Sequence, residues 1–167
     1  FIMATDKATI NISASLLPAD VKVSIGGTIT HETTDGPGGA GKWISYGIDI
    51  DTSSEVVIPA DIGYLTGSNV SGVTPTRTAT ADKVEFLVLK HSGFRSDGST
   101  KSAASECVHF NFTDSVAGAA STGNLRLNPG EIWWGRFSGA SDTADVTAIA
   151  IGNDVKLLVY SILHDSG

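Results

Sequence analysis

Apolar and polar residues alternate with a period of two along much of this 167-residue chain. The alternation covers 10–16, 21–25, 44–50 and 108–112, where an apolar or aromatic residue occupies every second position. Successive side chains of a β-strand point to opposite faces, so this pattern predicts strands with one face on a core. An amphipathic helix would instead need apolar residues three and four apart. The alternation therefore favours an all-β fold.

Three further runs, 56–58, 86–89 and 157–160, are apolar or aromatic at every position. Such runs predict strands covered on both faces, by a second sheet on one side and a neighbouring molecule on the other. Clusters of Gly, Pro, Asn, Asp and Ser separate the runs and are typical of tight turns. We therefore predict one domain, 1–167, folded as an antiparallel, jelly-roll-like β-sandwich of about eight strands.

Two local predictions concern the second half of the chain. Gly152, Asn153 and Asp154 are turn residues between the apolar stretch 146–151 and the final run, so we expect these two strands to form a hairpin. The best helix candidate is the Ala-rich segment 115–121, for which an irregular loop is an equal alternative.

Charge and cysteine content exclude several functional classes. Only 17% of the residues are charged, the net charge is −7, and the chain has just 11 Lys and Arg residues. Phosphate backbones and anionic lipids attract clustered basic residues, so we expect neither nucleic acid nor a membrane as a partner. The N-terminal residues also lack the layout of a signal peptide. The single cysteine, Cys107, lies in a strand-like stretch, and we expect a small buried apolar residue there.

The segment Gly36–Lys42 has the GxxxxGK spacing of a phosphate-binding loop. The next residue of such a loop must be Ser or Thr to hold Mg²⁺, but here it is Trp43. The loop must also begin a helix, whereas the alternation over 44–50 predicts a strand. We interpret this segment as a surface loop that binds no nucleotide.

No catalytic or metal-binding motif is present. The segment 49–53 begins like a calcium loop, but an EF-hand needs Gly at its sixth position and Glu at its twelfth, which are Ser54 and Ala60 here. The four histidines form no HExxH motif, and no GxSxG segment presents a serine. We expect a protein that is not an enzyme and has no cofactor or metal. Two alternatives are kept. One is a weak calcium site in the sandwich. The other is an enzyme, which a pocket that gathers His31, His91 or His164 with carboxylates would indicate.

The aromatic segment from Ile132 to Phe137 is the most informative local feature. In a strand, Trp133 and Trp134 point to opposite faces, so one can fill the core while the other lies under a loop or meets a partner or sugar. Aromatic residues and Arg are enriched at interface hot spots. The candidate partner interface therefore comprises Trp43, Trp133, Trp134, Arg136 and Phe137.

A resemblance begins at the turn Leu127-Asn128-Pro129-Gly130-Glu131, which leads into a strand, and continues through the apolar strands of 146–163. These features resemble small jelly-roll and β-sandwich proteins of tailed-phage virions, of the capsid cement, decoration and head-fibre-base types. The resemblance covers the C-terminal part of the chain and its overall composition. It implies a homo-oligomer, with a trimer favoured, on the capsid surface in contact with the major capsid protein or other virion proteins, and it implies no catalytic residue.

The function that we expect is therefore a virion structural protein that stabilises the shell through protein–protein contacts. The main alternative is a lectin-like or host-receptor-binding sandwich of a virion tail or cell surface, which would need an exposed aromatic ring beside polar groups. A matrix, pilus or S-layer subunit is a further alternative, and it would present or donate a free strand edge.

Overall fold

The computed structural model describes residues 7–16, 23–32, 41–53, 55–59, 83–112, 125–137 and 145–164. These residues form strands and connecting turns, and among them there is no α-helix. None of them belongs to a helix that is long and apolar enough to cross a membrane. The helix candidate 115–121 and most of the loop Gly36–Lys42 lie outside the described residues.

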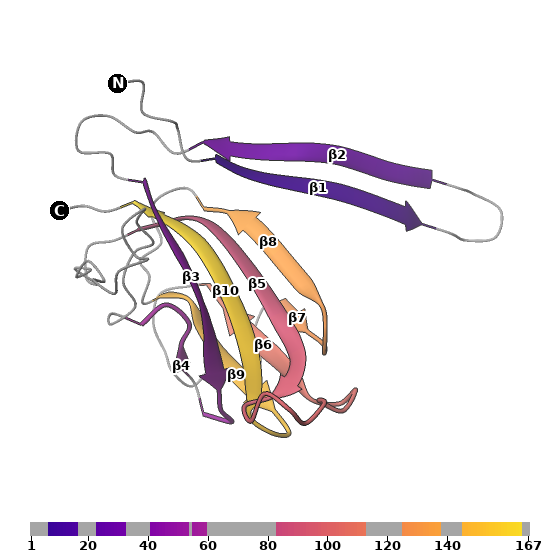
Figure 1. Ribbon diagram of the computed structural model, residues 1–167, viewed down its shortest axis with the longest axis vertical. Helices are drawn as coiled ribbons and strands as arrows, with labels where there is room; N and C mark the ends of the chain where they lie inside the picture. Colours follow the sequence, from indigo (N-terminus) through magenta and orange to yellow (C-terminus); the bar gives the residue numbers. More distant parts are fainter. Residues whose placement is uncertain are drawn as a thin grey trace. The chain divides into compact units, whose positions relative to one another are not determined.

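The described residues form ten strands (Figure 1). In chain order these are β1 (Lys7–Leu16), β2 (Val23–Glu32), β3 (Gly41–Ile50), β4 (Glu55–Val56), β5 (Lys83–Arg95), β6 (Cys107–Asn111), β7 (Leu125–Leu127), β8 (Ile132–Arg136), β9 (Thr147–Ile151) and β10 (Val155–His164). Contacts divide the chain into two units, Phe1–Gly39 and Ala40–Gly167. The first unit contains the β1–β2 pair and the second contains the other eight strands. The prediction of one domain over 1–167 stays a prediction for the chain as a whole.

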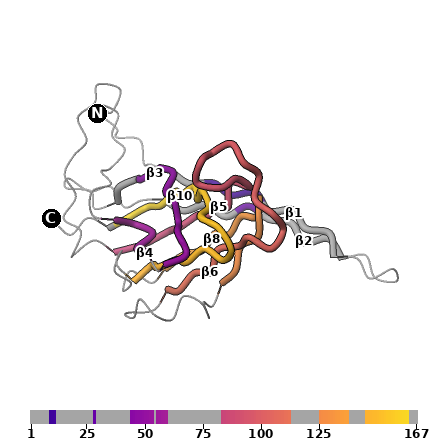
Figure 2. The backbone as a smooth tube through the Cα atoms, turned by 90° about the horizontal axis from the view of Figure 1, so that it is seen from below, coloured from indigo at the N-terminus to yellow at the C-terminus, as the bar shows by residue number. Residues whose placement is uncertain are grey.

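The second unit is an antiparallel sandwich of two four-stranded sheets, ordered β3-β10-β5-β8 and β4-β9-β6-β7 (Figures 1 and 2). The first four strands of this unit pair in reverse order with the last four, as β3 with β10, β4 with β9, β5 with β8 and β6 with β7. These four pairs together form one long hairpin that is rolled up into the sandwich. The pairs β10–β5 and β9–β6 join its strands within the two sheets. The strand order is that of a jelly roll, which confirms the predicted fold class.

The predicted C-terminal hairpin is wrong. β9 pairs with β4 and β6 in one sheet, whereas β10 pairs with β3 and β5 in the other. The turn at Gly152, whose φ is +95°, therefore carries the chain between the layers and not between two paired strands. A turn residue marks a reversal of the chain but not the sheet that the next strand joins.

The core lies between the two sheets because the alternating residues of both place their apolar sides there. Leu89, Leu157 and Val159 of one sheet pack with Val108 and Phe110 of the other, and all are fully buried. Burying each such side chain contributes about 1.5–3 kcal/mol relative to leaving it exposed. Cys107 is buried and free, as predicted.

The turn from Asn128 to Glu131 connects β7 of one sheet to β8 of the other. Pro129 and Gly130 occupy its central positions, and the φ of +84° at Gly130 together with Pro before it fits a type II turn. The Glu131 amide donates to the Asn128 carbonyl at 3.0 Å. The Glu131 carboxylate accepts from the Asn128 amide at 2.8 Å, which lowers the pKa of Glu131. The turn is also tied to β5, since His91 exchanges backbone hydrogen bonds with Gly130 and Glu131.

Candidate functional site

The outer face of the sheet β3-β10-β5-β8 is the first candidate site. We use "outer face" for the side of this sheet that points away from the core. Leu157 and Val159 belong to the core, so the intervening Leu158 and the following Tyr160 point outward. On β8, Trp133 packs on the core, so Ile132 and Trp134 lie on the outer face.

The strand register brings these apolar residues together. Val88 of β5 lies between Tyr160 of β10 and Trp134 of β8 in one row across the sheet. In the next row, Lys90 lies between Leu158 and Ile132. Ile132 is 60% exposed and Tyr160 is 42% exposed, while Leu158, Val88 and Trp134 are half-buried. Aromatic residues are enriched in interface cores, whereas lysines such as the exposed Lys90 are depleted there.

Toward one end of the outer face the side chains are already covered. Phe86 and Ile162 are paired partners on neighbouring strands, and both are buried although neither belongs to the core cluster between the sheets. The hydroxyl of Ser161 donates to the Phe86 carbonyl at 2.7 Å, beside a register shift in the β5–β10 pairing. The exposed part of the outer face therefore lies around Tyr160 and Ile132.

The two adjacent tryptophans of β8 have different surroundings, because they point to opposite faces as predicted. The Trp133 ring stacks on Phe112 with a centroid distance of 4.9 Å and meets the edge of Phe137 at 6.3 Å. Phe112 and Phe137 are themselves 5.6 Å apart. Aromatic pairs of this kind add about 0.5–1.5 kcal/mol each beyond the area that they bury. Trp133 and Phe137 thus stabilise the sandwich from the core side.

Of the five predicted interface residues, the structure places two on the outer face, Trp134 and the exposed Arg136. Trp133 and Phe137 pack against the core. Trp43 lies in β3 opposite Ile162 of β10, and its side chain is outside the described part. Tyr160, Ile132 and Leu158 were not among the predicted interface residues, although Ile132 begins the aromatic segment. The uninterrupted apolar run 157–160 was the signal for two of them, since it left apolar residues on both faces of one strand.

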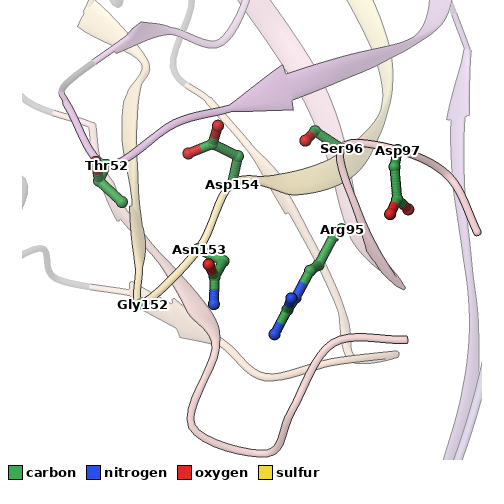
Figure 3. Close-up of a pocket in the computed structure, with 7 residues that line it drawn as sticks. All are labelled: Thr52, Arg95, Ser96, Asp97, Gly152, Asn153 and Asp154. Carbon is green, nitrogen blue, oxygen red and sulfur yellow. The ribbon is translucent and has the colours of Figure 1, made fainter. Parts of the chain in front are cut away.

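The second candidate site is an open pocket where loops meet at one end of the sandwich. We call it the loop-end pocket; its volume is about 350 Å³ (Figure 3). It is lined by Thr52, Arg95, Ser96, Asp97, Gly152, Asn153 and Asp154. The lining residues come from the last residue of β5 and from the segments that follow β3, β5 and β9, so the rolled topology brings three distant parts of the chain together.

A buried carboxylate organises the loop-end pocket. Glu106 accepts from the Arg95 guanidinium at 2.6 and 3.1 Å, from the Asn153 amide at 2.6 Å and from the Ala103 backbone at 3.0 Å. In Figure 3, Arg95 and Asn153 extend toward the same side of the pocket. The Arg95 hydrogen bonds, followed by those of Asn153 and Ala103, lower the pKa of Glu106 to about 2. Glu106 is therefore ionised and hydrogen-bonded at neutral pH, as is usual for a buried polar side chain that stabilises a fold.

The remaining ionisable groups near this end also serve local structure. Asp97 accepts from the hydroxyl and amide of Thr100 and from the Ser99 amide, and these bonds lower the pKa of Asp97 to about 2. Asp51 accepts from both the amide and the hydroxyl of Ser53, which lowers the pKa of Asp51. Partial burial, followed by the charge of Asp51, raises the pKa of Glu55.

His91 is fully buried. Its Nδ1 accepts from the Gly93 amide at 3.1 Å, whereas its Nε2 makes no hydrogen bond of ordinary geometry. Burial lowers the pKa of His91, against smaller opposing effects of the Glu106 backbone and the carboxylates of Glu106 and Glu131. The neutral imidazole is therefore the form that fits the folded protein.

The described residues include no group of three or more His, Cys, Asp or Glu side chains placed to hold a metal ion. Asp49, at the start of the calcium-like segment, forms an ion pair with Lys156 of the neighbouring strand at 2.5 Å. No pattern in the sequence predicts the Arg95–Glu106–Asn153 network, because its members lie 11 and 47 positions apart and share no motif.

The chain was compared with protein-family models, with curated proteins and with solved structures. No family model, curated protein or solved structure matches it. The outer face, the loop-end pocket and the fold are therefore the observations that bear on function.

Proposed function

We propose that this protein is a non-enzymatic structural subunit of a virion, a capsid cement or decoration protein that stabilises the shell through protein–protein contacts. The observation that carries the proposal is the outer face, where Ile132, Tyr160 and the half-buried Trp134 lie on neighbouring strands around the exposed Lys90. Apolar surface of this kind costs free energy while it faces water, and covering it in an assembly recovers about 25 cal/mol per Å².

The topology supports the same proposal by analogy. Eight strands rolled into two four-stranded sheets form the jelly roll, an architecture shared by viral capsid and lectin domains. Proteins with one fold carry out many functions, so this analogy leaves two candidates, a shell protein and a sugar-binding protein.

The chemistry of the buried polar groups supports a structural role as well. A general acid or base needs a pKa near the working pH and an open hydrogen-bonding position. Glu106 has neither, since its pKa is about 2 and Arg95, Asn153 and Ala103 occupy its oxygens. The network fixes the loops at one end of the sandwich.

The proposal is tested by co-sedimentation of the full chain with capsids prepared without it. We expect saturable binding to the shell and a higher melting temperature of the decorated capsids. The double variant Ile132→Ser/Tyr160→Ser should bind at least tenfold more weakly. Val56→Ser/Ile151→Ser is the matched control, because these residues are 39% and 36% exposed on the other sheet. A chain that ignores such capsids, or two variants that bind alike, would overturn the proposal.

A lectin-like or host-receptor-binding module is the second candidate, and the loop-end pocket is the observation that favours it. Its volume of about 350 Å³ and its lining of Asp, Asn, Arg, Ser and Thr side chains suit a polyhydroxylated ligand. Glycan-array binding that is lost in Asp154→Ala but kept in Trp134→Ala would support this candidate. The absence of glycan binding would exclude it.

A further inference from the structure

His91 lies between the two sheets, close to the loop end of the sandwich. It follows the core residues Leu87 and Leu89 at a spacing of two along β5, so its ring points to the same side of the sheet as theirs. Its pairing partner on β10 is the apolar core residue Leu157, and the ring is fully buried. Histidine is the side chain whose ordinary pKa lies between about pH 5 and pH 8, so a buried histidine makes the local structure sensitive to mild acid.

The hydrogen bonds of the His91 ring fix where its proton lies. Nδ1 accepts from the Gly93 amide at 3.1 Å, so Nδ1 carries the lone pair and Nε2 carries the proton. Nε2 makes no hydrogen bond of ordinary geometry. A second proton can be added only at Nδ1, where it would point at the N–H of Gly93. The charged ring would then lose its hydrogen bond and face a second donor while buried, which costs free energy.

Two carboxylates lie near enough to His91 to affect its charge. Glu106 accepts from the Arg95 guanidinium at 2.6 Å, and Glu131 accepts from the Asn128 amide at 2.8 Å. Neither carboxylate hydrogen-bonds to the His91 ring. Burial lowers the pKa of His91, and the Glu106 backbone and the two negative charges oppose this only in part. The closed structure therefore favours the neutral ring.

The backbone is held differently on the two sides of this ring. His91 itself exchanges backbone hydrogen bonds with Gly130 and Glu131, which keep it on the sandwich. Gly93 has a φ of +86°, a conformation that glycine adopts without strain. We use "loop-end segment" for residues 92–105, all of which are exposed or half-buried and none of which belongs to the core cluster. A segment with so few buried contacts opens at a lower free energy than the core strands.

We propose that His91 is a pH-sensitive switch: when mild acid adds a proton at Nδ1, the loop-end segment separates from the sandwich and the loop-end pocket opens. Arg95, Ser96 and Asp97 line the pocket and belong to this segment. The Ser96 amide donates to the Asp154 carbonyl of the β9–β10 turn at 3.1 Å, so opening breaks this bond and takes the pocket apart. The inference uses no residue of the outer face and goes beyond the proposed function.

Amide hydrogen exchange of the full chain tests the switch. It is followed by NMR at pH 7.5 and pH 5.5, corrected for intrinsic rates and repeated in low urea. The amides of Arg95, Ser96 and Ser102 report on the loop-end segment, and those of Val57 and Phe137, bonded elsewhere in the sandwich, are internal controls. Urea distinguishes local opening from global unfolding, because its effect scales with the surface exposed.

We expect opening of the loop-end segment to become about three- to tenfold more favourable at pH 5.5, because the open form takes up the proton of His91 more readily. Low urea should leave this opening unchanged while it accelerates exchange at the controls. Exchange of the segment that ignores pH, or that accelerates with urea as the controls do, would overturn the proposal.

His91→Asn separates the charge of the ring from its hydrogen bond. An Asn side-chain oxygen accepts from the amide two residues on, as in an Asx turn, but takes up no proton. We expect this variant to keep the loop-end segment closed at both pH values. His109→Asn is the matched control, because the core residues Val108 and Phe110 place His109 on the other face of β6, and it should keep the pH dependence of the wild type. A pH dependence that survives in His91→Asn, or disappears in His109→Asn, would refute the switch.

The nitrogen chemical shifts of the His91 ring test the geometry without a variant. At pH 7.5 we expect an unprotonated Nδ1 and a protonated Nε2, and at pH 5.5 a charged ring that appears together with the open segment. The opposite tautomer at pH 7.5 would contradict the proposal. A loop end that stays closed in a protein that binds capsids would refute this inference alone, and a working switch in a protein that ignores capsids would refute the proposed function alone.

Discussion

Gly135 of β8 provides a sharp test of which way the two tryptophans point. A Cβ added at this position would lie 2.6 and 2.7 Å from Cη2 and Cζ2 of Trp133, well inside the 3.4 Å at which ordinary contact begins. The Trp133 ring cannot simply swing away, because it is stacked on Phe112 and held by the edge of Phe137. Gly135→Ala should therefore disturb the aromatic cluster on the core side.

The magnitude follows from two opposing effects. Forcing an extra carbon into a packed site costs about 1–3 kcal/mol. Replacing Gly by Ala also restricts the unfolded chain, which returns about 0.4–1 kcal/mol. We expect a net loss of about 1–2 kcal/mol in the free energy of unfolding, or roughly 2–8 °C in melting temperature for a chain of this size.

Gly47→Ala in β3 is the matched control, because it adds the same methyl group to the same sheet. Its Cβ would meet Leu158 and Lys156 at 3.6 Å, which is ordinary contact distance. We expect no loss, or a gain of up to about 1 kcal/mol. Urea unfolding followed by tryptophan fluorescence measures both variants. If Gly135→Ala were as stable as the wild type, Trp133 would not cover Gly135 and the assignment of the faces of β8 would be wrong.

Three further predictions concern the buried polar groups and the cysteine. The Arg95, Asn153 and Ala103 hydrogen bonds lower the pKa of Glu106 to about 2 from 4.5, so this carboxylate should contribute stability above pH 4.5 that is lost as the pH falls toward 2. In urea titrations at several pH values, Glu106→Gln should flatten that acid limb and lower stability at pH 7; an unchanged limb would contradict the assignment. Burial lowers the pKa of His91 below 6.5, so the unfolded chain takes up this proton first and stability should fall as the pH drops below about 6.5. His91→Asn should remove this dependence, and a slope that survives in the variant would place its origin elsewhere. Cys107 is 2% exposed, so a thiol reagent should label it only after denaturation, and rapid labelling of the native protein would refute its burial.

Much of the sandwich could be predicted from local pattern. The alternation over 44–50 and 108–112 places Ile44 and Ile50 of β3 and Val108 and Phe110 of β6 in the core, because the period of two fixes which side chains share a face. The opposite directions of Trp133 and Trp134 follow from the same rule. The separation of the β1–β2 hairpin as a unit of its own did not follow, since its alternation resembles that of the sandwich strands.

The features of the fold and of the candidate sites that could not be predicted depend on contacts between distant segments of the chain. Gly152 marks a turn in any topology, so the sequence could not show that β9 and β10 lie in different sheets. The rolled pairing of β3 with β10 also decides which loops meet, and hence that Arg95, Glu106 and Asn153 form one network. The exposure of Ile132 and Tyr160 likewise depends on the register of three strands and not on any local motif.

The central claim is that the outer face of the sheet β3-β10-β5-β8 is covered when the protein is assembled. Hydroxyl-radical footprinting of the capsid-bound protein, read by mass spectrometry at single residues, tests this claim most directly. In the single chain, Ile132 at 60% is more exposed than Val56 at 39% and Ile151 at 36% on the other sheet. The account predicts that assembly reverses this order, with Ile132 and Tyr160 protected while Val56 and Ile151 stay labelled. Labelling of Ile132 that still exceeds that of Val56 and Ile151 on the particle would contradict it.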